Sequence, residues 1–218
     1  MYANAAFPLT ISLGYPEPDK MDRTLASVLM DVINDEEFDI TDGLLHHEEG
    51  VDVLPGNIEL SGIEISLIGV ISRETILKEY VNRARELYDY IIIDCMPSLG
   101  ILTVNALACA DSVLIPVQAA YLPVKGLQQL IKTIGRVKRQ LNPDLQVEGI
   151  LLTMVDNRTN YAKDIALQVY DAYSSSVRVF DCEIPLSVRA AEISAEGSSL
   201  YEYDPNDPCG SASIINTL

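Results

Sequence analysis

The sequence has 218 residues, 48% of them hydrophobic, and a net charge of −17. The apolar content excludes a disordered chain, and the length is enough for one domain with a substantial core. Because no apolar run approaches the roughly 20 residues that span a bilayer and the N-terminus lacks a secretory pattern, we expect a cytoplasmic protein without membrane contact.

The first half of the chain predicts short helices and strands that are separated by loops rich in proline, glycine and acidic residues. The clearest helix covers residues 73–88, because its apolar residues recur every three or four positions. The other expected elements are a helix over residues 24–30, an acidic loop over 35–42, a strand over 51–54 and a helix over 57–67 that Asn57 caps.

The second half predicts longer elements, in which strands alternate with helices. The expected elements are strands over residues 90–94, 112–117, 147–155 and 177–180, and helices over 99–110, 124–141 and 161–173. This alternation predicts an α/β fold of three layers, with a mostly parallel sheet and helices on both faces.

The strand over residues 90–94 carries the main candidate site. Three isoleucines run directly into Asp94, and the turn Pro97-Ser98-Leu99-Gly100 follows. So short an apolar run predicts a strand that is buried on both faces. Open α/β sheets bind ligands at the carboxyl ends of their strands, so Asp94 is a candidate to hold the water shell of Mg²⁺ beside phosphates. The alternative is an ordinary aspartate that opens a turn.

Charge is unevenly distributed along the chain. Residues 1–100 carry 6 Lys and Arg against 19 Asp and Glu, a net charge of −13. The helix over 124–141 instead carries Lys125, Lys132, Arg136 and Arg139 on the face opposite its apolar residues. The overall acidity argues against tight charge-driven binding of nucleic acid. The basic stripe is either a solvated outer face or a surface that contacts phosphates.

The residues from Tyr88 to Cys95, with the turn that follows, resemble the Walker B and switch region of ParA-type partition ATPases. Other segments resemble that family in the same order, and together they cover roughly residues 9–205. They are residues 9–14, 54–57, 111–118, 148–154 with 156–160, 184–189 and 203–205.

The resemblance implies a deviant P-loop NTPase fold that binds ATP and Mg²⁺, dimerises around the nucleotide, and binds DNA without sequence preference. It further implies a ParB-type partner that stimulates hydrolysis. Asp94 would be the catalytic acid that serves ATP and holds Mg²⁺ through water. Asn157 and Pro185 would line the adenine pocket, and Arg158 and Arg189 would lie on the DNA-binding surface.

The sequence departs from the family at its N-terminus. The chain contains no GxxxxGK[ST], the loop whose backbone amides and lysine hold the phosphates. We therefore expect a single ParA-like domain over residues 1–205 that lacks the family's first strand, phosphate loop and first helix. Residues 1–8 look unrelated to the family's second strand, and residues 206–218 are expected to form an irregular tail. Loss of a central strand would leave neighbouring strand edges unpaired.

Three interpretations are compatible with these motifs. The first is a ParA-like chromosome or plasmid partitioning protein, truncated or degenerate, that cannot bind and hydrolyse ATP by the family mechanism and is inactive alone. The second is a non-catalytic pseudo-ATPase that acts as an interaction module. It would form a heterodimer with an intact ParA-like chain or bind a ParB-type partner. A homodimer is also compatible with the family. The third is an unrelated α/β binding domain, which the ordered set of motifs disfavours.

Overall fold

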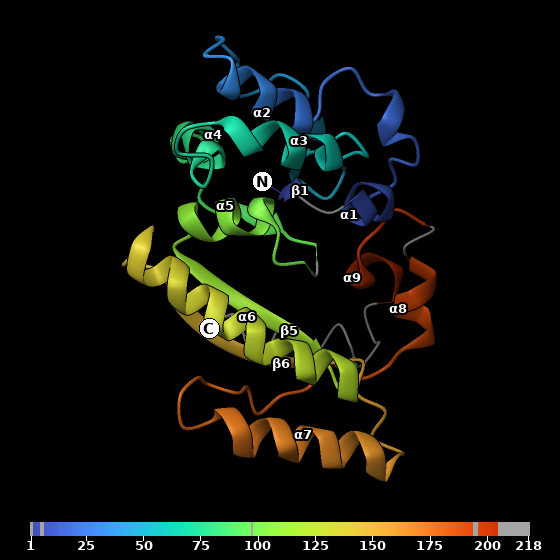
Figure 1. The fold of residues 1–218 in the computed structure, drawn as a ribbon. Coiled ribbons are helices and arrows are strands. Elements are labelled where there is room, and N and C mark those ends of the chain that lie inside the picture. The colour runs from blue at the N-terminus through green and yellow to red at the C-terminus, as the bar shows by residue number, and fades with distance from the viewer. Residues whose placement is uncertain (1, 5–6, 97, 194–195, 205–218) are drawn as a thin grey trace. The chain divides into compact units, whose positions relative to one another are not determined.

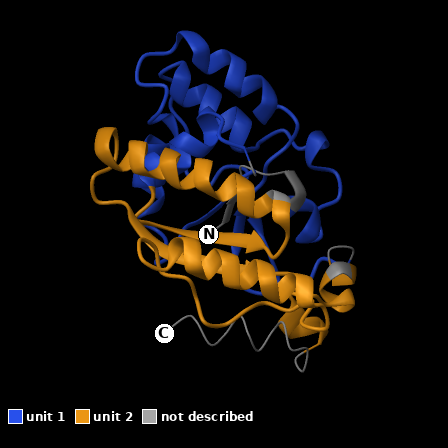
Figure 2. Ribbon diagram, turned by 60° about the horizontal axis from the view of Figure 1, so that its bottom comes forward, with its two compact units in different colours: residues 1–109, 194–198 blue, residues 110–193, 199–218 orange. Residues whose placement is uncertain are grey.

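The computed structural model describes residues 2–4, 7–96, 98–193 and 196–204 (Figure 1). The chain forms two compact units (Figure 2). The first unit contains residues 1–109 and 194–198, and the second contains residues 110–193 and 199–218. The expected tail, residues 206–218, lies outside the described residues.

The first unit is built on a four-stranded sheet in the order β2-β3-β1-β4. Its strands are β1 (Tyr2–Asn4), β2 (Leu45–His46), β3 (Asp52–Leu54) and β4 (Ile92–Asp94). Strand β1 is parallel to both β3 and β4, whereas β2 and β3 are antiparallel. The sequence predicts no strand over residues 1–8. Three residues are too few to display the alternating pattern by which a strand is recognised.

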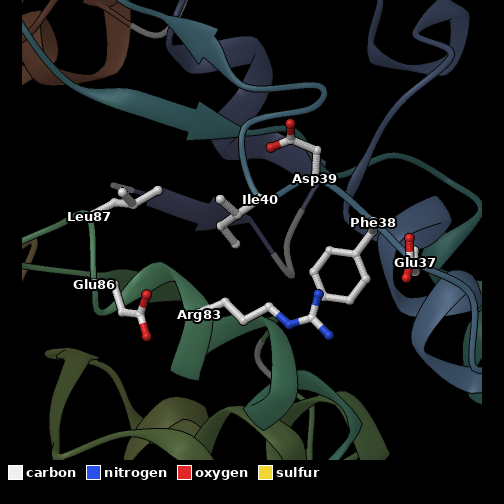
Figure 3. Close-up of a pocket in the computed structure, with 7 residues that line it drawn as sticks. All are labelled: Glu37, Phe38, Asp39, Ile40, Arg83, Glu86 and Leu87. Atoms are coloured by element: carbon white, nitrogen blue, oxygen red, sulfur yellow. The ribbon is translucent and has the colours of Figure 1, made fainter.

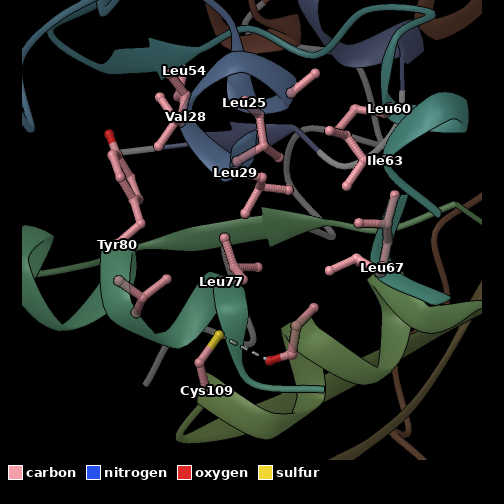
Figure 4. Packing of buried hydrophobic residues seen from close by; sticks show 14 of the residues in the cluster. Leu25, Val28, Leu29, Leu54, Leu60, Ile63, Leu67, Leu77, Tyr80 and Cys109 are labelled. Atoms are coloured by element: carbon pink, nitrogen blue, oxygen red, sulfur yellow. Dashed lines mark hydrogen bonds between the residues drawn. The ribbon is translucent and has the colours of Figure 1, made fainter. Parts of the chain in front are cut away.

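Four helices of the first unit pack around an apolar cluster (Figure 4). They are α2 (Leu25–Ile33), α3 (Leu60–Ser66), α4 (Ile76–Ala84) and α5 (Ile101–Cys109). The unit also contains α1 (Phe7–Ser12) and short 3-10 turns at Pro18–Lys20 and Leu67–Gly69. Leu25, Leu29, Leu77 and Tyr80 lie in the cluster, each no more than 2% exposed. Helices α2, α4 and α5 each contribute apolar side chains, spaced three or four residues apart, to this cluster.

Two sequence predictions in this unit are wrong. Asn57 is not the cap of α3, because the helix begins after Glu59 and the Asn57 side chain is buried, 3.5 Å from the Thr24 hydroxyl. Strand β4 is not buried on both faces, since Ile92 is 50% exposed. Strand β4 lies at one end of the four-stranded order, and an apolar run cannot distinguish a central strand from an end strand.

The second unit contains two parallel strands, β5 (Ser112–Gln118) and β6 (Gln146–Thr153). They lie between helices α6 (Tyr121–Gln140) and α7 (Asn160–Tyr173) (Figures 1 and 2). Two shorter helices follow, α8 (Val188–Glu192) and α9 (Leu200–Tyr203). In place of the strand expected over residues 177–180, one parallel bridge joins Val179 to Ile150.

Helix α6 has the polarity that the sequence predicts. Leu127, Ile134 and Val137 are buried, whereas Lys132 and Arg136 are exposed. No helix in the described part of the chain is long and apolar enough to cross a membrane.

Gly149 is required where β6 pairs with β5. The register shifts between Val113 and Leu114, and Gly149 follows the extra residue on β6. A Cβ atom there would lie 2.8 Å from both the Arg178 carbonyl oxygen and the Phe180 ring. We expect Gly149→Ala to lower the free energy of unfolding by about 1–3 kcal/mol, as measured by urea denaturation.

The matched control is Gly126→Ala in α6. A Cβ atom at Gly126 meets nothing within 4 Å. This change should raise stability by up to about 1 kcal/mol, because alanine loses less backbone entropy in a helix. If both substitutions changed the free energy of unfolding equally, the close contacts described at Gly149 would not limit the residue at that position.

Candidate functional site

Asp94 is the last residue of β4, at the carboxyl end of the sheet in the first unit. Strands β1, β3 and β4 run parallel, so their carboxyl ends share this edge, and Asn4 is level with Asp94. The Asp94 side chain is half-buried, and burial raises its pKa. Among the described residues its carboxylate has no hydrogen-bond or ion-pair partner. An acid that is desolvated and unpaired at a strand end is typical of a ligand site.

The turn after Asp94 packs tightly before α5 begins. The Ser98 amide donates to the Met96 carbonyl at 2.7 Å, and the Thr103 hydroxyl donates to the Ser98 carbonyl at 2.9 Å. A Cβ atom at Gly100 would lie 2.2 Å from Oε1 of Glu64, so only glycine fits there without moving Glu64. That Glu64 oxygen is buried and has no hydrogen-bond partner within the described structure. Pro97 lies outside the described residues.

A buried polar cluster, which the sequence does not predict, fixes the loop after β3. The Gly56 amide donates to the Thr10 hydroxyl at 3.1 Å, and the Leu25 amide donates to the Pro55 carbonyl at 2.8 Å. Thr10 is fully buried, and Asn57 is 3% exposed. Buried hydroxyls keep a loop in one conformation because leaving them unpaired costs free energy. The pairing joins residues 46 positions apart, so no local pattern could have revealed it.

Asn157 and Pro185 lie in two loops that the second unit brings together after β6. Val155 forms a parallel bridge with Pro185, and the Leu186 amide donates to the Val155 carbonyl at 3.1 Å. Met154, just before the bridge, has a φ of 53°, which is strained for a residue with a side chain. The two loops expected at the adenine are therefore adjacent.

Arg158 and Arg189 each form an intramolecular ion pair in the second unit. The Arg158 guanidinium contacts both carboxylate oxygens of Asp156, at 2.7 and 2.9 Å, and these bonds lower the pKa of Asp156. Arg189 pairs with Asp204. Both arginine side chains remain largely exposed, so the pairs are weak and can exchange for another anion.

Asp94 is a single candidate metal ligand. In the part of the chain that the structure describes, no three His, Cys, Asp or Glu side chains are grouped to hold a metal ion directly. A lone carboxylate suits a cation that keeps most of its water shell, as Mg²⁺ does. The remaining ligands would have to come from water and from a bound phosphate.

Comparison with known proteins identifies the family to which this chain belongs. Residues 3–147 match the model of a family described as "AAA domain". The sporulation initiation inhibitor protein Soj of Bacillus subtilis is 46% identical over 157 residues, 72% of this chain and 61% of its own. The chain belongs to the ParA-type P-loop ATPase family. The chromosome partitioning protein ParA of Myxococcus xanthus is 42% identical over 187 residues, 85% of this chain and 64% of its own.

The chain thus spans less than two thirds of the length of these relatives. Among solved structures, it is similar to cobyrinic acid a,c-diamide synthase from Mycobacterium smegmatis with bound ADP and magnesium. That structure has a TM-score of 0.77 and 34% identity, and the match covers 89% of this chain and 78% of the other. The α/β fold with a mostly parallel sheet is of the P-loop NTPase type, as the sequence predicts.

The burial of Asp94 gives a test of the site that needs no ligand. Because the folded pKa is raised, the native state binds more protons than the unfolded state, and stability falls as pH rises from about 3.9 through that raised pKa. Asp94→Asn removes the charge that burial disfavours. We expect it to raise Tm at pH 7 by about 2–4 °C, a gain of about 1 kcal/mol, and to lose this gain near pH 3.

The control is the exposed Asp144, where Asp144→Asn should leave Tm unchanged at both pH values. A lower Tm for Asp94→Asn at pH 7 would show that the carboxylate stabilises the fold, and would argue against a site kept for a ligand.

Proposed function

We propose that the chain is a cytoplasmic ParA-like partitioning protein, and that these 218 residues carry only part of a nucleotide site. Alone, they neither bind nor hydrolyse ATP by the family mechanism. The main support for this proposal is the position of Asp94. Its acidic side chain is half-buried and, among the described residues, unpaired, at the carboxyl ends of parallel strands. Its position supports the Walker B role, whereas the printed sequence has no GxxxxGK[ST] to place a phosphate beside it.

The residues present fit part of the ligand set for Mg-ATP. In the first unit, Asp94 would hold Mg²⁺ through water. In the second unit, the loops of Asn157 and Pro185, which lie beside each other, would contact the adenine. Bound Mg²⁺ would neutralise charge that develops on the transferred phosphoryl group. If a phosphate loop completed the site, Asp94 would orient metal-bound water, and this role would require its carboxylate to be ionised.

DNA is the second expected ligand, and α6 supports this contact beyond Arg158 and Arg189. The helix carries Lys125, Lys132, Arg136, Lys138 and Arg139, and it contains no acidic residue. All five side chains are exposed, and none is in an ion pair within the described structure. We propose that the DNA surface includes this face of α6, because its cations are not already neutralised as those of Arg158 and Arg189 are.

A second candidate function is a pseudo-ATPase that pairs with another chain, either an intact ParA-like chain or a ParB-type partner. Strand β4 favours it, because β4 is at one end of its sheet order and exposes half of Ile92. An apolar strand at the end of a sheet is a template for pairing with another chain.

Mixing with an intact relative separates the two candidates. We expect the fluorescently labelled chain to sediment unchanged when B. subtilis Soj and Mg-ATP are added, and the ATPase rate of Soj to stay the same. A complex of one chain with one Soj molecule, lost with Ile92→Glu on the exposed edge of β4, would instead establish the second candidate.

DNA binding is tested with the pair Lys132→Glu and Arg136→Glu. Titration of a labelled duplex at several salt concentrations should show weaker binding and a slope of log K against log salt smaller by about 2, because two phosphate contacts are lost. Lys20→Glu with Lys163→Glu, also exposed, makes the same change in net charge. If this control weakens binding equally, α6 does not contact DNA.

A further inference from the structure

A groove in the first unit lies between the loop after α2 and the end of α4 (Figure 3). Its volume is about 590 Å³. The loop contributes residues 37–40, and α4 and the turn that follows contribute Arg83, Glu86 and Leu87. We call it the acidic groove. It does not include Asp94 or the loops expected at the nucleotide.

The floor of the acidic groove is apolar and held in place. Phe38 and Ile40 are half-buried against the core. The Phe38 ring stacks on the Tyr80 ring with centroids 5.9 Å apart, and Tyr80 is fully buried. Leu87 is 55% exposed at the other side. The groove is therefore formed before any ligand arrives, which lowers the entropic cost of binding.

The rim of the acidic groove carries uncompensated negative charge. Glu37, Asp39 and Glu86 are exposed, and within the described structure the carboxylates of Glu37 and Glu86 have no partner. The one cation, Arg83, lies 4.2 Å above the Phe38 ring and donates to Glu79 at 2.9 Å. Arg83 is thus already engaged and does not neutralise the rim.

The sequence around the acidic groove is also strongly acidic. Residues 35–42 contain five acidic residues and no basic one, and the first 100 residues have a net charge of −13. Such a field repels nucleic acid and acidic proteins and raises the association rate of cationic partners. Direct coordination of a divalent metal is not favoured, because no three potential ligands are grouped anywhere in the described residues.

We propose that the acidic groove binds a short cationic amphipathic segment of a partner protein. Lysine or arginine side chains of that segment pair with Glu37, Glu86 and Asp39. An apolar side chain between them covers Ile40 and Leu87. Charge complementarity supplies orientation and association rate, while the apolar contact supplies most of the free energy of binding. This interaction does not require nucleotide.

The test is fluorescence anisotropy of three labelled 12-residue peptides with the full chain. One alternates lysine with leucine, the second replaces its lysines with glutamate, and the third replaces its leucines with serine. We expect micromolar binding of the first alone, weakened at least tenfold by Glu37→Gln with Glu86→Gln and also by Leu87→Ser. These side chains are exposed, so the variants should fold, and circular dichroism verifies that they do.

The matched control is Glu48→Gln with Asp171→Asn, two exposed carboxylates outside the groove. It changes the net charge equally and should weaken binding less than twofold. Equal weakening by both pairs would show that only net charge matters and would overturn the proposal. Failure of the lysine-leucine peptide to bind, or equal binding of the serine peptide, would overturn it as well.

Discussion

The parallel pairing of β1 with both β3 and β4 is the interaction on which the first unit depends. Three residues, Tyr2–Asn4, join the β2–β3 pair to the strand that carries Asp94. Because the three strands are parallel, the turn after Asp94 and the loop after β3 leave the sheet at the same edge. The buried Thr10 then holds the loop after β3 in place. The geometry around Asp94 thus follows from a very short strand.

Sequence patterns predict the fold class and most elements, because helices such as α6 and α7 are long enough for their apolar spacing to be read. They do not predict strand β1, the exposure of Ile92 or the burial of Asn57 beside Thr24. Each of these depends on contacts between residues far apart in the chain. Of the candidate site, Asp94 could be named because its place after an apolar run has a physical meaning. Arg158 and Arg189 could be named only by family resemblance.

Charge is segregated along this chain. The acidic half carries the groove around Phe38, and α6 carries five cations without an acid. Segregated charge gives two surfaces that attract opposite kinds of partner, which a uniformly acidic surface of −17 would not provide.

Calorimetry with Mg-ATP tests whether these 218 residues bind the nucleotide. The measurement compares this chain with B. subtilis Soj, its 46% identical relative, in the same buffer. We expect heat of binding for Soj and none for this chain up to about 1 mM nucleotide, because the proposed Walker B acid has no GxxxxGK[ST] loop in these residues to hold a phosphate beside it. Micromolar binding of Mg-ATP by these 218 residues, lost with Asp94→Ala, would contradict it.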